Sequence, residues 1–278
     1  EFLNSPSGKA KCGQISAWKR SFRSMFIQEN RTKQKLKAGQ PVYGVISTSD
    51  DPQLAELFGL AGFDYYMLDA EHGLLDPAQV VNVIRACESV KMTPMVRIGP
   101  RDPKLVLQYL DAGMMGIMMP GLESANDVKM LIDAVKYPPL GKRGLGLTRA
   151  AGYVAIGEKG AQYVDFANEQ TMVITQFEDP ALINRFEEII SQPGLDAVIV
   201  GPRDLSLNMG FKDGPSHPEV QSMIERVIAI CKKANVAAGI TAGTRAIAEK
   251  EISRGMTMIL GVAQTLFLAG SKEFLLET

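Results

Sequence analysis

Several charged side chains stand in or directly after short apolar runs of this sequence, and their types suit metal binding and proton transfer. They are Asp69 and His72 after YYML, Arg97 inside PMVRIG, Glu178 after MVITQF, and Asp204 after AVIVGPR. Carboxylate oxygens are preferred ligands of Mg²⁺ and Mn²⁺, and an imidazole can move a proton near neutral pH. These residue types predict a site for a hard divalent cation and a small anionic molecule.

The two carboxylates Glu178 and Asp204 form the predicted metal site. If the runs before them are neighbouring parallel strands, about 4.8 Å apart, both carboxylates can reach one point above the strand ends. The alternative is that each carboxylate caps the helix or turn that follows it. The two residues together favour metal binding.

His72 is one of only two histidines and is the predicted general base. Asp69 stands three residues earlier, and we expect it to hold the imidazole in one tautomer. The alternative for His72 is a packed or solvated side chain without a catalytic role. Glu71 is either a supporting partner of the site or a solvated residue. The second histidine, His217, precedes a helical pattern and is expected to be a cap residue.

Arg97 is flanked by apolar residues, so its guanidinium is expected to be buried beside an anion. That anion is either a protein carboxylate or the oxygens of a bound 2-oxo acid, whose enolate charge the guanidinium would stabilise. Arg143, in the stretch GKRGLG, either reaches the same site from a long loop or makes a subunit contact.

These side chains need a scaffold that brings many strand ends together. From Pro41 onward, short apolar runs alternate with helical periodicity, which indicates parallel strands joined by helices. The eight predicted strands are PVYGVIST, YYMLDAEH, TPMVRIG, GIMMPG, MVITQFED, DAVIVGP, AAGITAG and MTMILGVAQ. Eight such units favour a single-domain α/β protein, a (β/α)8 TIM barrel whose C-terminal strand ends form the site. An open doubly wound sheet is the alternative, but no GxGxxG loop follows the first strand.

Two features of the intervening segments complete this interpretation. Pro77 and Pro218 are expected in the first turns of their helices. The segment from Tyr137 to Gln170 is longer than an ordinary link between a helix and a strand. We expect it to cover the active site or to make a subunit contact.

Composition excludes several classes of protein. The chain has 278 residues, of which 46% are hydrophobic and 22% charged, with a net charge of −1. A mildly acidic body argues against nucleic-acid binding, and no apolar run approaches the roughly 20 residues that cross a membrane. The three cysteines, Cys12, Cys87 and Cys231, follow neither a disulfide nor a zinc pattern, which predicts reduced thiols and a cytoplasmic protein.

The N-terminal residues differ from the rest in charge. Residues 1–37 contain nine lysine and arginine residues against two glutamates. We expect residues 1–29 to be a flexible basic tail and residues 30–278 to form the barrel domain.

Five short motifs, in order along the chain, resemble the HpcH/HpaI aldolase family. They are LDAEHG around Asp69, MVRIG around Arg97, YPPLGKRG from Tyr137, QFED around Glu178 and GPRDLS from Gly201. The resemblance extends from about Asn30 to the C-terminus. It implies a class II pyruvate aldolase that cleaves a 4-hydroxy-2-oxo acid to pyruvate and an aldehyde through an enolate stabilised by a divalent metal.

The resemblance also implies a role for each site residue. Glu178 and Asp204 would bind Mg²⁺, Mn²⁺ or Co²⁺, and His72 with Asp69 would handle the proton. The residues implied at the substrate are Arg97, Gln176, Gly201 and Asp204. Ile46 stands where some members carry an aromatic residue. The resemblance further implies a homohexamer, with the apolar C-terminal segment TLFLAGSKEFLL exchanged between subunits.

Two other functions remain open. The first is a synthase of the same superfamily, which would add the enolate to an oxo acid and leave nearly the same motifs. The second is a barrel that has lost catalysis and acts as a binding scaffold. The scaffold is disfavoured because every polar position that the chemistry requires is filled.

Overall fold

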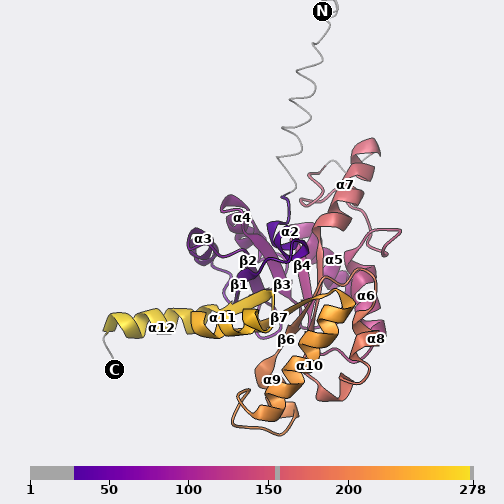
Figure 1. The fold of residues 1–278 in the computed structure, drawn as a ribbon. Helices are drawn as coiled ribbons and strands as arrows, with labels where there is room; N and C mark the ends of the chain where they lie inside the picture. The colour runs from indigo at the N-terminus through magenta and orange to yellow at the C-terminus, as the bar shows by residue number, and fades with distance from the viewer. Residues whose placement is uncertain (1–27, 154–156, 276–278) are drawn as a thin grey trace, which may run out of the picture.

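The protein forms a closed barrel of eight parallel strands in the computed structural model, which describes residues 28–153 and 157–275. Each strand pairs with the next one along the chain, and β8 closes the barrel against β1 (Figure 1). The strands are β1 (Val42–Ser47), β2 (Tyr65–Asp69), β3 (Thr93–Arg97), β4 (Gly116–Met119), β5 (Met172–Phe177), β6 (Ala197–Val200), β7 (Ala237–Thr241) and β8 (Met258–Val262). The predicted (β/α)8 barrel and all eight strands are confirmed.

Helices surround the barrel, and α12 extends away from it in Figure 1. They are α2 (Arg31–Lys37), α3 (Pro52–Leu60), α4 (Val81–Ser89), α5 (Pro103–Ala112), α6 (Ala125–Val135), α7 (Gly157–Gln170), α8 (Phe186–Ile190), α9 (Pro202–Asn208), α10 (Pro218–Ala234), α11 (Arg245–Ser253) and α12 (Ala263–Leu275), with a 3₁₀ turn η1 (Pro180–Leu182). None of these helices is long and apolar enough to span a membrane.

The strands are buried on both faces because alternate side chains point into the barrel and out toward the helices. Inward-facing residues form one core, which includes Met67, Met95, Ile174 and Ile199. Gly44 lets the Tyr65 ring lie across this interior, since a Cβ at position 44 would stand 2.1 Å from that ring. The barrel is therefore a packed core, and only its ends can hold a site.

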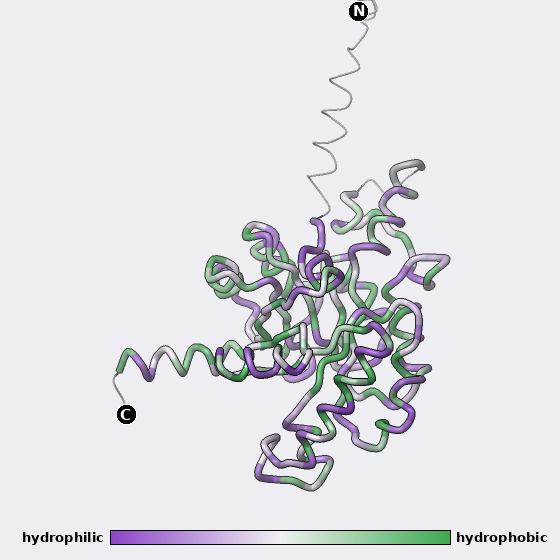
Figure 2. The backbone as a smooth tube through the Cα atoms, in the orientation of Figure 1, coloured by the Kyte–Doolittle hydropathy of each residue, from purple (hydrophilic) through white to green (hydrophobic). Residues whose placement is uncertain are grey.

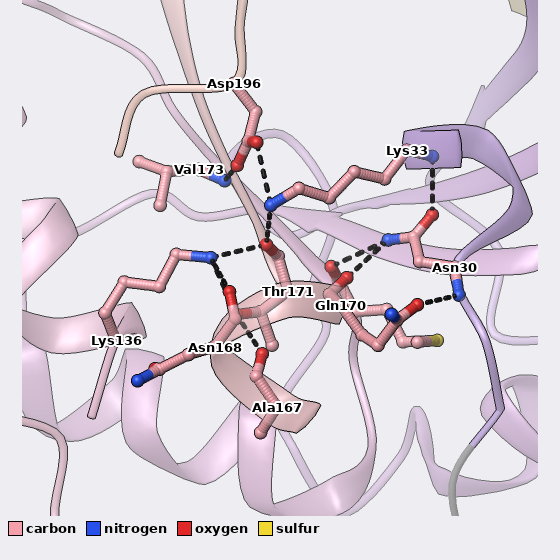
Figure 3. Close-up of polar contacts among 10 residues, drawn as sticks. Asn30, Lys33, Lys136, Ala167, Asn168, Gln170, Thr171, Val173 and Asp196 are labelled. Atoms are coloured by element: carbon pink, nitrogen blue, oxygen red, sulfur yellow. Dashed lines mark hydrogen bonds and ion pairs between the residues drawn. The ribbon is translucent and has the colours of Figure 1, made fainter. Parts of the chain in front are cut away.

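The end where the strands begin, the barrel floor, is closed by α2. Leu36 of this helix packs against the interior core, and the Thr32 hydroxyl lies 2.8 Å from the hydroxyl of Thr93. Lys33 forms an ion pair of 2.8 Å with Asp196, and the Asn30 amide donates to the carbonyl of Gln170 (Figure 3). These contacts join segments far apart in sequence and leave the opposite end free for chemistry.

Lys136 is the second lysine at the floor, and it is almost completely buried. Its ammonium donates to the carbonyls of Asn168 and Thr171 at 2.8 and 2.6 Å (Figure 3). Burial, and then the positive charge of Lys33, lower the pKa of Lys136 to about 7, although Asp196 opposes the shift. Lys37 adds a smaller effect in the same direction as Lys33.

The free energy of unfolding should therefore rise with pH above 7. The unfolded chain holds the Lys136 proton up to about pH 10.4, so between these values the unfolded state binds more protons. One group can contribute at most about 1.4 kcal/mol per pH unit. Urea unfolding at pH 6 to 9 should show this extra slope in the wild type and in Lys129→Met, an exposed control, but not in Lys136→Met. Parallel curves for wild type and Lys136→Met would contradict the expectation.

The structure differs from the sequence-based expectations for two segments. Pro77 was expected in the first turn of its helix, but helix α4 begins only at Val81. The Asp76 carboxylate accepts hydrogen bonds from the N–H groups of Ala78 and Gln79 and fixes a turn around Pro77 instead. Pro218 does begin α10, where the expected cap His217 accepts a hydrogen bond from the Glu219 N–H.

Within its described residues, 137–153 and 157–170, the long segment after α6 does not lie over the strand ends. Arg143 pairs with Asp111 at 2.9 Å, and Arg149 pairs with Glu88. Asp111 and Glu88 lie at the C-terminal ends of α5 and α4, which lead back to the barrel floor. The expectations of an active-site cover and of Arg143 in the site are therefore wrong, whereas the subunit contact stays a prediction.

The remaining sequence-based expectations are that the cysteines are reduced and that residues 1–29 form a flexible basic tail. Cys87 and Cys231 are buried free thiols. Cys12 and residues 1–27 of the expected basic tail lie outside the described residues. Gln28, at its end, donates a hydrogen bond of 2.9 Å to the carbonyl of Met92.

Candidate active site

The candidate site lies at the mouth of the barrel, the end where the strands finish. Asp69 and Arg97 are register partners at the last positions of β2 and β3. Gln176 is the residue before last in β5, two positions after the inward-facing Ile174. The twofold alternation of side chains thus points all three into the top of the barrel.

Arg97 is held by protein carboxylates, as one of the two alternatives anticipated. Its Nε and Nη2 donate to the two Asp69 carboxylate oxygens at 2.9 and 2.6 Å, and Nε lies 3.1 Å from Glu71. Burial disfavours the charged guanidinium and acts to lower the pKa of Arg97. The hydrogen bonds and the charge of Asp69 outweigh this effect, so the pKa of Arg97 is raised. Among the described residues, Nη1 makes only a long contact of 3.5 Å to the side-chain amide oxygen Oε1 of Gln176. This third nitrogen is the one placed to meet a bound anion.

Asp69 does not contact the His72 imidazole, contrary to the expected pairing. Its carboxylate binds Arg97 and accepts from the backbone N–H groups of Glu71 and His72. Burial raises the pKa of Asp69, but the hydrogen bond and charge of Arg97 outweigh it and leave the pKa below its usual value. Asp69 is therefore an ionised anchor for Arg97 and for the turn after β2.

The His72 side chain is 68% exposed, and its Nε2 lies 3.9 Å from the Glu71 carboxylate. Glu71 in turn lies beside Arg97, so it connects the buried guanidinium with the exposed imidazole. The imidazole is therefore free to approach a molecule at the mouth, with Glu71 rather than Asp69 as its neighbour.

Glu178 follows β5 directly and is held in a fixed position. The Gln176 amide donates a short hydrogen bond to its carboxylate. The backbone of Gly121 has a small lowering effect on the pKa of the same carboxylate. Gly201 lies against the same group, since a Cβ there would be 2.7 Å from the Gln176 amide nitrogen and 3.0 Å from a Glu178 carboxylate oxygen. Any larger residue at position 201 would therefore displace the Gln176 and Glu178 side chains from these positions.

Asp204 lies in the first turn of α9, after the neighbouring strand β6. It is exposed, and its charge acts on Glu178. Neither carboxylate has the capping role considered as the alternative. Asp179 rather than Glu178 caps η1, and α9 begins at Gly201 without a side-chain cap.

The electrostatics of Glu178 suit a cation. Burial, followed by the charges of Asp204 and Glu71, raises the pKa of Glu178, and Arg97 only partly offsets them. A cation between Glu178 and Asp204 would relieve this repulsion, and two carboxylates are an ordinary protein contribution to Mg²⁺ or Mn²⁺. Within residues 28–153 and 157–275, no group of three or more His, Cys, Asp or Glu side chains is arranged to hold a metal ion. The match between this site and a divalent cation therefore rests on the two carboxylates Glu178 and Asp204.

Gly121 is the residue of the site that sequence reasoning missed. It lies just after β4 with a φ of 63°, a backbone conformation that favours glycine. The signal was present, because the Pro120–Gly121 pair marks a turn at a strand end. Its effect on Glu178 could not be read from that signal, since a backbone group leaves no trace in residue type.

A closed parallel barrel with carboxylates, an arginine and a histidine at its C-terminal mouth defines a (β/α)8-barrel enzyme. The chain belongs to the HpcH/HpaI aldolase/citrate lyase family, whose sequence profile matches residues 43–268.

Similar proteins extend over nearly the whole chain. Hydroxypyruvate/pyruvate aldolase of Pseudomonas aeruginosa is 34% identical over 252 residues, which cover 90% of this chain and 92% of that protein. The 4-hydroxy-2-oxo-heptane-1,7-dioate aldolase of Salmonella typhimurium is 34% identical and covers 88% and 92% of the two chains. The crystal structure of a family member from Burkholderia cenocepacia superposes with a TM-score of 0.82 at 32% identity, covering 89% of this chain and 98% of that one.

Proposed function

We propose that this protein is a divalent-metal-dependent aldolase that reversibly cleaves a 4-hydroxy-2-oxo acid to pyruvate and an aldehyde. The observation that carries the proposal is the fixed, partly desolvated Glu178, repelled by Asp204 and Glu71 beside the buried Arg97. The names of the two relatives, a hydroxypyruvate/pyruvate aldolase and a 4-hydroxy-2-oxo-heptane-1,7-dioate aldolase, support the substrate class.

Glu178 and Asp204 would hold Mg²⁺, Mn²⁺ or Co²⁺. When bound, the cation would polarise the 2-oxo group and lower the barrier to charge development at C3. Arg97, already fixed by Asp69, would direct Nη1 at the substrate oxygens and stabilise the same negative charge. Gln176 would hold the Arg97 and Glu178 side chains in place, and Gly201 would let Gln176 and Glu178 pack against the backbone beside the substrate.

His72 would act as the general base. In cleavage it takes the proton of the 4-hydroxyl group, directly or through a water molecule, while the C3–C4 bond breaks and the aldehyde leaves. In condensation it returns that proton to the alkoxide. The Glu71 carboxylate lies 3.9 Å from the imidazole Nε2 and would help to orient the ring.

The proton exchange of pyruvate at C3 provides the direct test. NMR in D2O should show exchange with Mg²⁺ or Mn²⁺ present, loss of exchange with a chelator, and recovery on adding metal. No lysine stands in the three residues after any strand, so borohydride with pyruvate should add no mass. A reduced pyruvyl adduct on a lysine, with activity that survives the chelator, would overturn the proposal.

A synthase that adds the enolate to an oxo acid is the second candidate, since it would need the same site. Substrate profiling separates the two, because consumption of a CoA thioester points to the synthase and release of an aldehyde to the aldolase. A scaffold without catalysis would show neither reaction and no proton exchange.

We also propose that the protein is a homo-oligomer, and a hexamer in particular. Helix α12 extends from the barrel with apolar stretches along it (Figure 2). Phe267 and Phe274 are 72% and 86% exposed, and Leu268 and Leu275 are exposed beside them. Exposed apolar side chains gathered in this way mark an interaction site, here for a second copy of the chain. Light scattering would report the assembly directly.

A further inference from the structure

Helix α9 contacts both halves of the proposed metal site. Asp204 lies in its first turn, and Asn208 is its last residue. The side-chain amide of Asn208 donates a hydrogen bond of 2.9 Å to the main-chain carbonyl of Glu178, which lies 30 residues earlier in the chain. The helix that carries one proposed ligand is therefore bonded to the backbone of the other.

The start of α9 is bonded to the same stretch of backbone. The N–H of Gly201, where α9 begins, donates to the carbonyl of Phe177 at 3.1 Å. The carbonyls of Phe177 and Glu178 are consecutive along the chain, and they bind opposite ends of one helix. Two points of attachment fix the direction of α9 relative to the end of β5, whereas one point would let the helix pivot.

Asp204 and Asn208 lie on the same side of α9. They are four residues apart, and side chains at this spacing stand one above the other on a helix. Because the Asn208 amide points to the Glu178 backbone, this side of the helix faces the end of β5. A pivot of α9 that breaks the Asn208 contact would therefore change the distance between the Glu178 and Asp204 carboxylates.

The helix needs such attachments because it is short. It has seven residues, a length at which an isolated helix is not stable. Leu205 and Ser206 are buried at its middle, whereas Leu207 and Asn208 in its last turn are exposed. Packing thus holds the middle of α9, and the Asn208 hydrogen bond adds a fixed point at its end.

The two carboxylates also repel each other when no cation lies between them. Such repulsion acts to move α9 away from the end of β5, and the hydrogen bond from Asn208 opposes that movement. A site that is kept at its binding distance does not have to pay for closing when the cation arrives.

We infer that Asn208 is a positioning residue, which holds α9 against the Glu178 backbone and thereby sets the spacing between the Glu178 and Asp204 carboxylates. The inference rests on the proposed metal-dependent function. Asn208 itself binds neither the cation nor the substrate in this account. Its contribution passes through one main-chain carbonyl on one side and one turn of helix on the other.

Mn²⁺ affinity measured by electron paramagnetic resonance is the first test. Asn208→Ala should raise the dissociation constant about tenfold, the lower end of the effect of losing a hydrogen-bond partner near a metal ligand. Cooperative unfolding should stay unchanged, because alanine favours a helix and the lost hydrogen bond is exposed. Asn126→Ala is the matched control, since it makes the same change at an exposed position of α6, which carries no proposed ligand.

The sign of the effect in Asn208→Asp separates positioning from charge. Aspartate has nearly the shape of asparagine, but its carboxylate has no N–H to donate to the Glu178 carbonyl. By Coulomb's law, an added negative charge near the site would by itself strengthen cation binding. Asn208→Asp should nevertheless bind Mn²⁺ more weakly than the wild type. This variant also serves as the test if Asn208→Ala does not fold.

A comparison of two cations tests the spacing itself. Mg²⁺ demands near-ideal octahedral geometry at about 2.0 to 2.1 Å, whereas Ca²⁺ accepts flexible geometry at about 2.3 to 2.6 Å. In competition with Mn²⁺, Asn208→Ala should therefore lose about tenfold in Mg²⁺ affinity and less than about threefold in Ca²⁺ affinity. Equal losses for the two cations would contradict a role in spacing.

A double variant locates the effect. Once Asp204 is no longer a ligand, its distance from Glu178 ceases to matter for binding. Adding Asn208→Ala to Asp204→Asn should therefore change the Mn²⁺ dissociation constant by less than about twofold. An effect of Asn208→Ala that persists undiminished in Asp204→Asn overturns the inference.

The outcomes separate this inference from the proposed function. A change below about threefold in Asn208→Ala, or tighter binding in Asn208→Asp, overturns the role of Asn208 while Glu178→Gln still weakens Mn²⁺ binding. If wild type and Glu178→Gln bind Mn²⁺ equally, the metal site itself is wrong, and the role of Asn208 is overturned with it.

Discussion

Replacing Glu178 by glutamine is expected to weaken Mn²⁺ binding by at least about 100-fold, because outer-sphere partners of a metal alone contribute roughly 10- to 100-fold. Pyruvate proton exchange should be lost with it. The barrel should stay folded, since relief from the charges of Asp204 and Glu71 offsets the weaker hydrogen bond from Gln176.

Calorimetric titration with Mn²⁺ and thermal unfolding together measure this expectation. Added Mn²⁺ should raise the melting temperature of the wild type but not of Glu178→Gln or Asp204→Asn. Asp179→Asn is the matched control, because Asp179 is the adjacent carboxylate and caps η1 instead of facing Asp204. Unchanged affinity in both Glu178→Gln and Asp204→Asn would remove the metal-site assignment.

His72→Ala is expected to keep cation and pyruvate binding while turnover falls by about 10² to 10⁴, the usual contribution of a positioned acid–base group. The imidazole is largely exposed, so its removal leaves no cavity in the barrel. Metal affinity and the pyruvate dissociation constant should match those of the wild type, and single-turnover cleavage should slow.

Asp69→Asn is the informative comparison for His72. Since Asp69 binds Arg97 rather than the imidazole, its substitution should weaken pyruvate binding as well as turnover. A loss below about threefold in His72→Ala would exclude His72 as the general base. Identical kinetic changes in both variants would restore the pairing expected from sequence.

The barrel was predictable because each strand is a short apolar run between helical patterns, a signal that survives without tertiary information. The same pattern placed Arg97, Glu178 and Asp204 at strand ends, where a parallel barrel exposes charged groups. That Glu178 and Asp204 follow neighbouring strands results from the order of β5 and β6 alone.

The partner of Asp69 was not predictable from sequence spacing. Three residues separate Asp69 from His72, which made a local pair plausible, but strand register sets Asp69 directly beside Arg97. A buried guanidinium binds the nearest carboxylate in that register because burial makes an unpaired charge costly. The register between β2 and β3 depends on how all eight strands pair to close the barrel, and it cannot be read from a local sequence pattern.

The position of the segment after α6 could have been deduced from topology. A helix that follows a strand of a parallel barrel returns to the end where the strands begin. Any extension between α6 and β5 must therefore start at the floor, where Arg143 and Arg149 are found. The prediction of an active-site cover considered only the length of the segment and not the end of the barrel at which the segment starts.

The closure of the floor by α2 and Lys136 has a consequence for altering the enzyme. Its ion pairs and hydrogen bonds lie at the opposite end of the strands from Glu178, and a strand spans roughly 17 to 20 Å. Leu74 and Leu207, on segments that follow β2 and β6 at the mouth, are exposed apolar side chains without a part in that closure. Substitutions at these two positions are expected to leave the melting temperature unchanged, because the variation does not reach the contacts that keep the barrel closed.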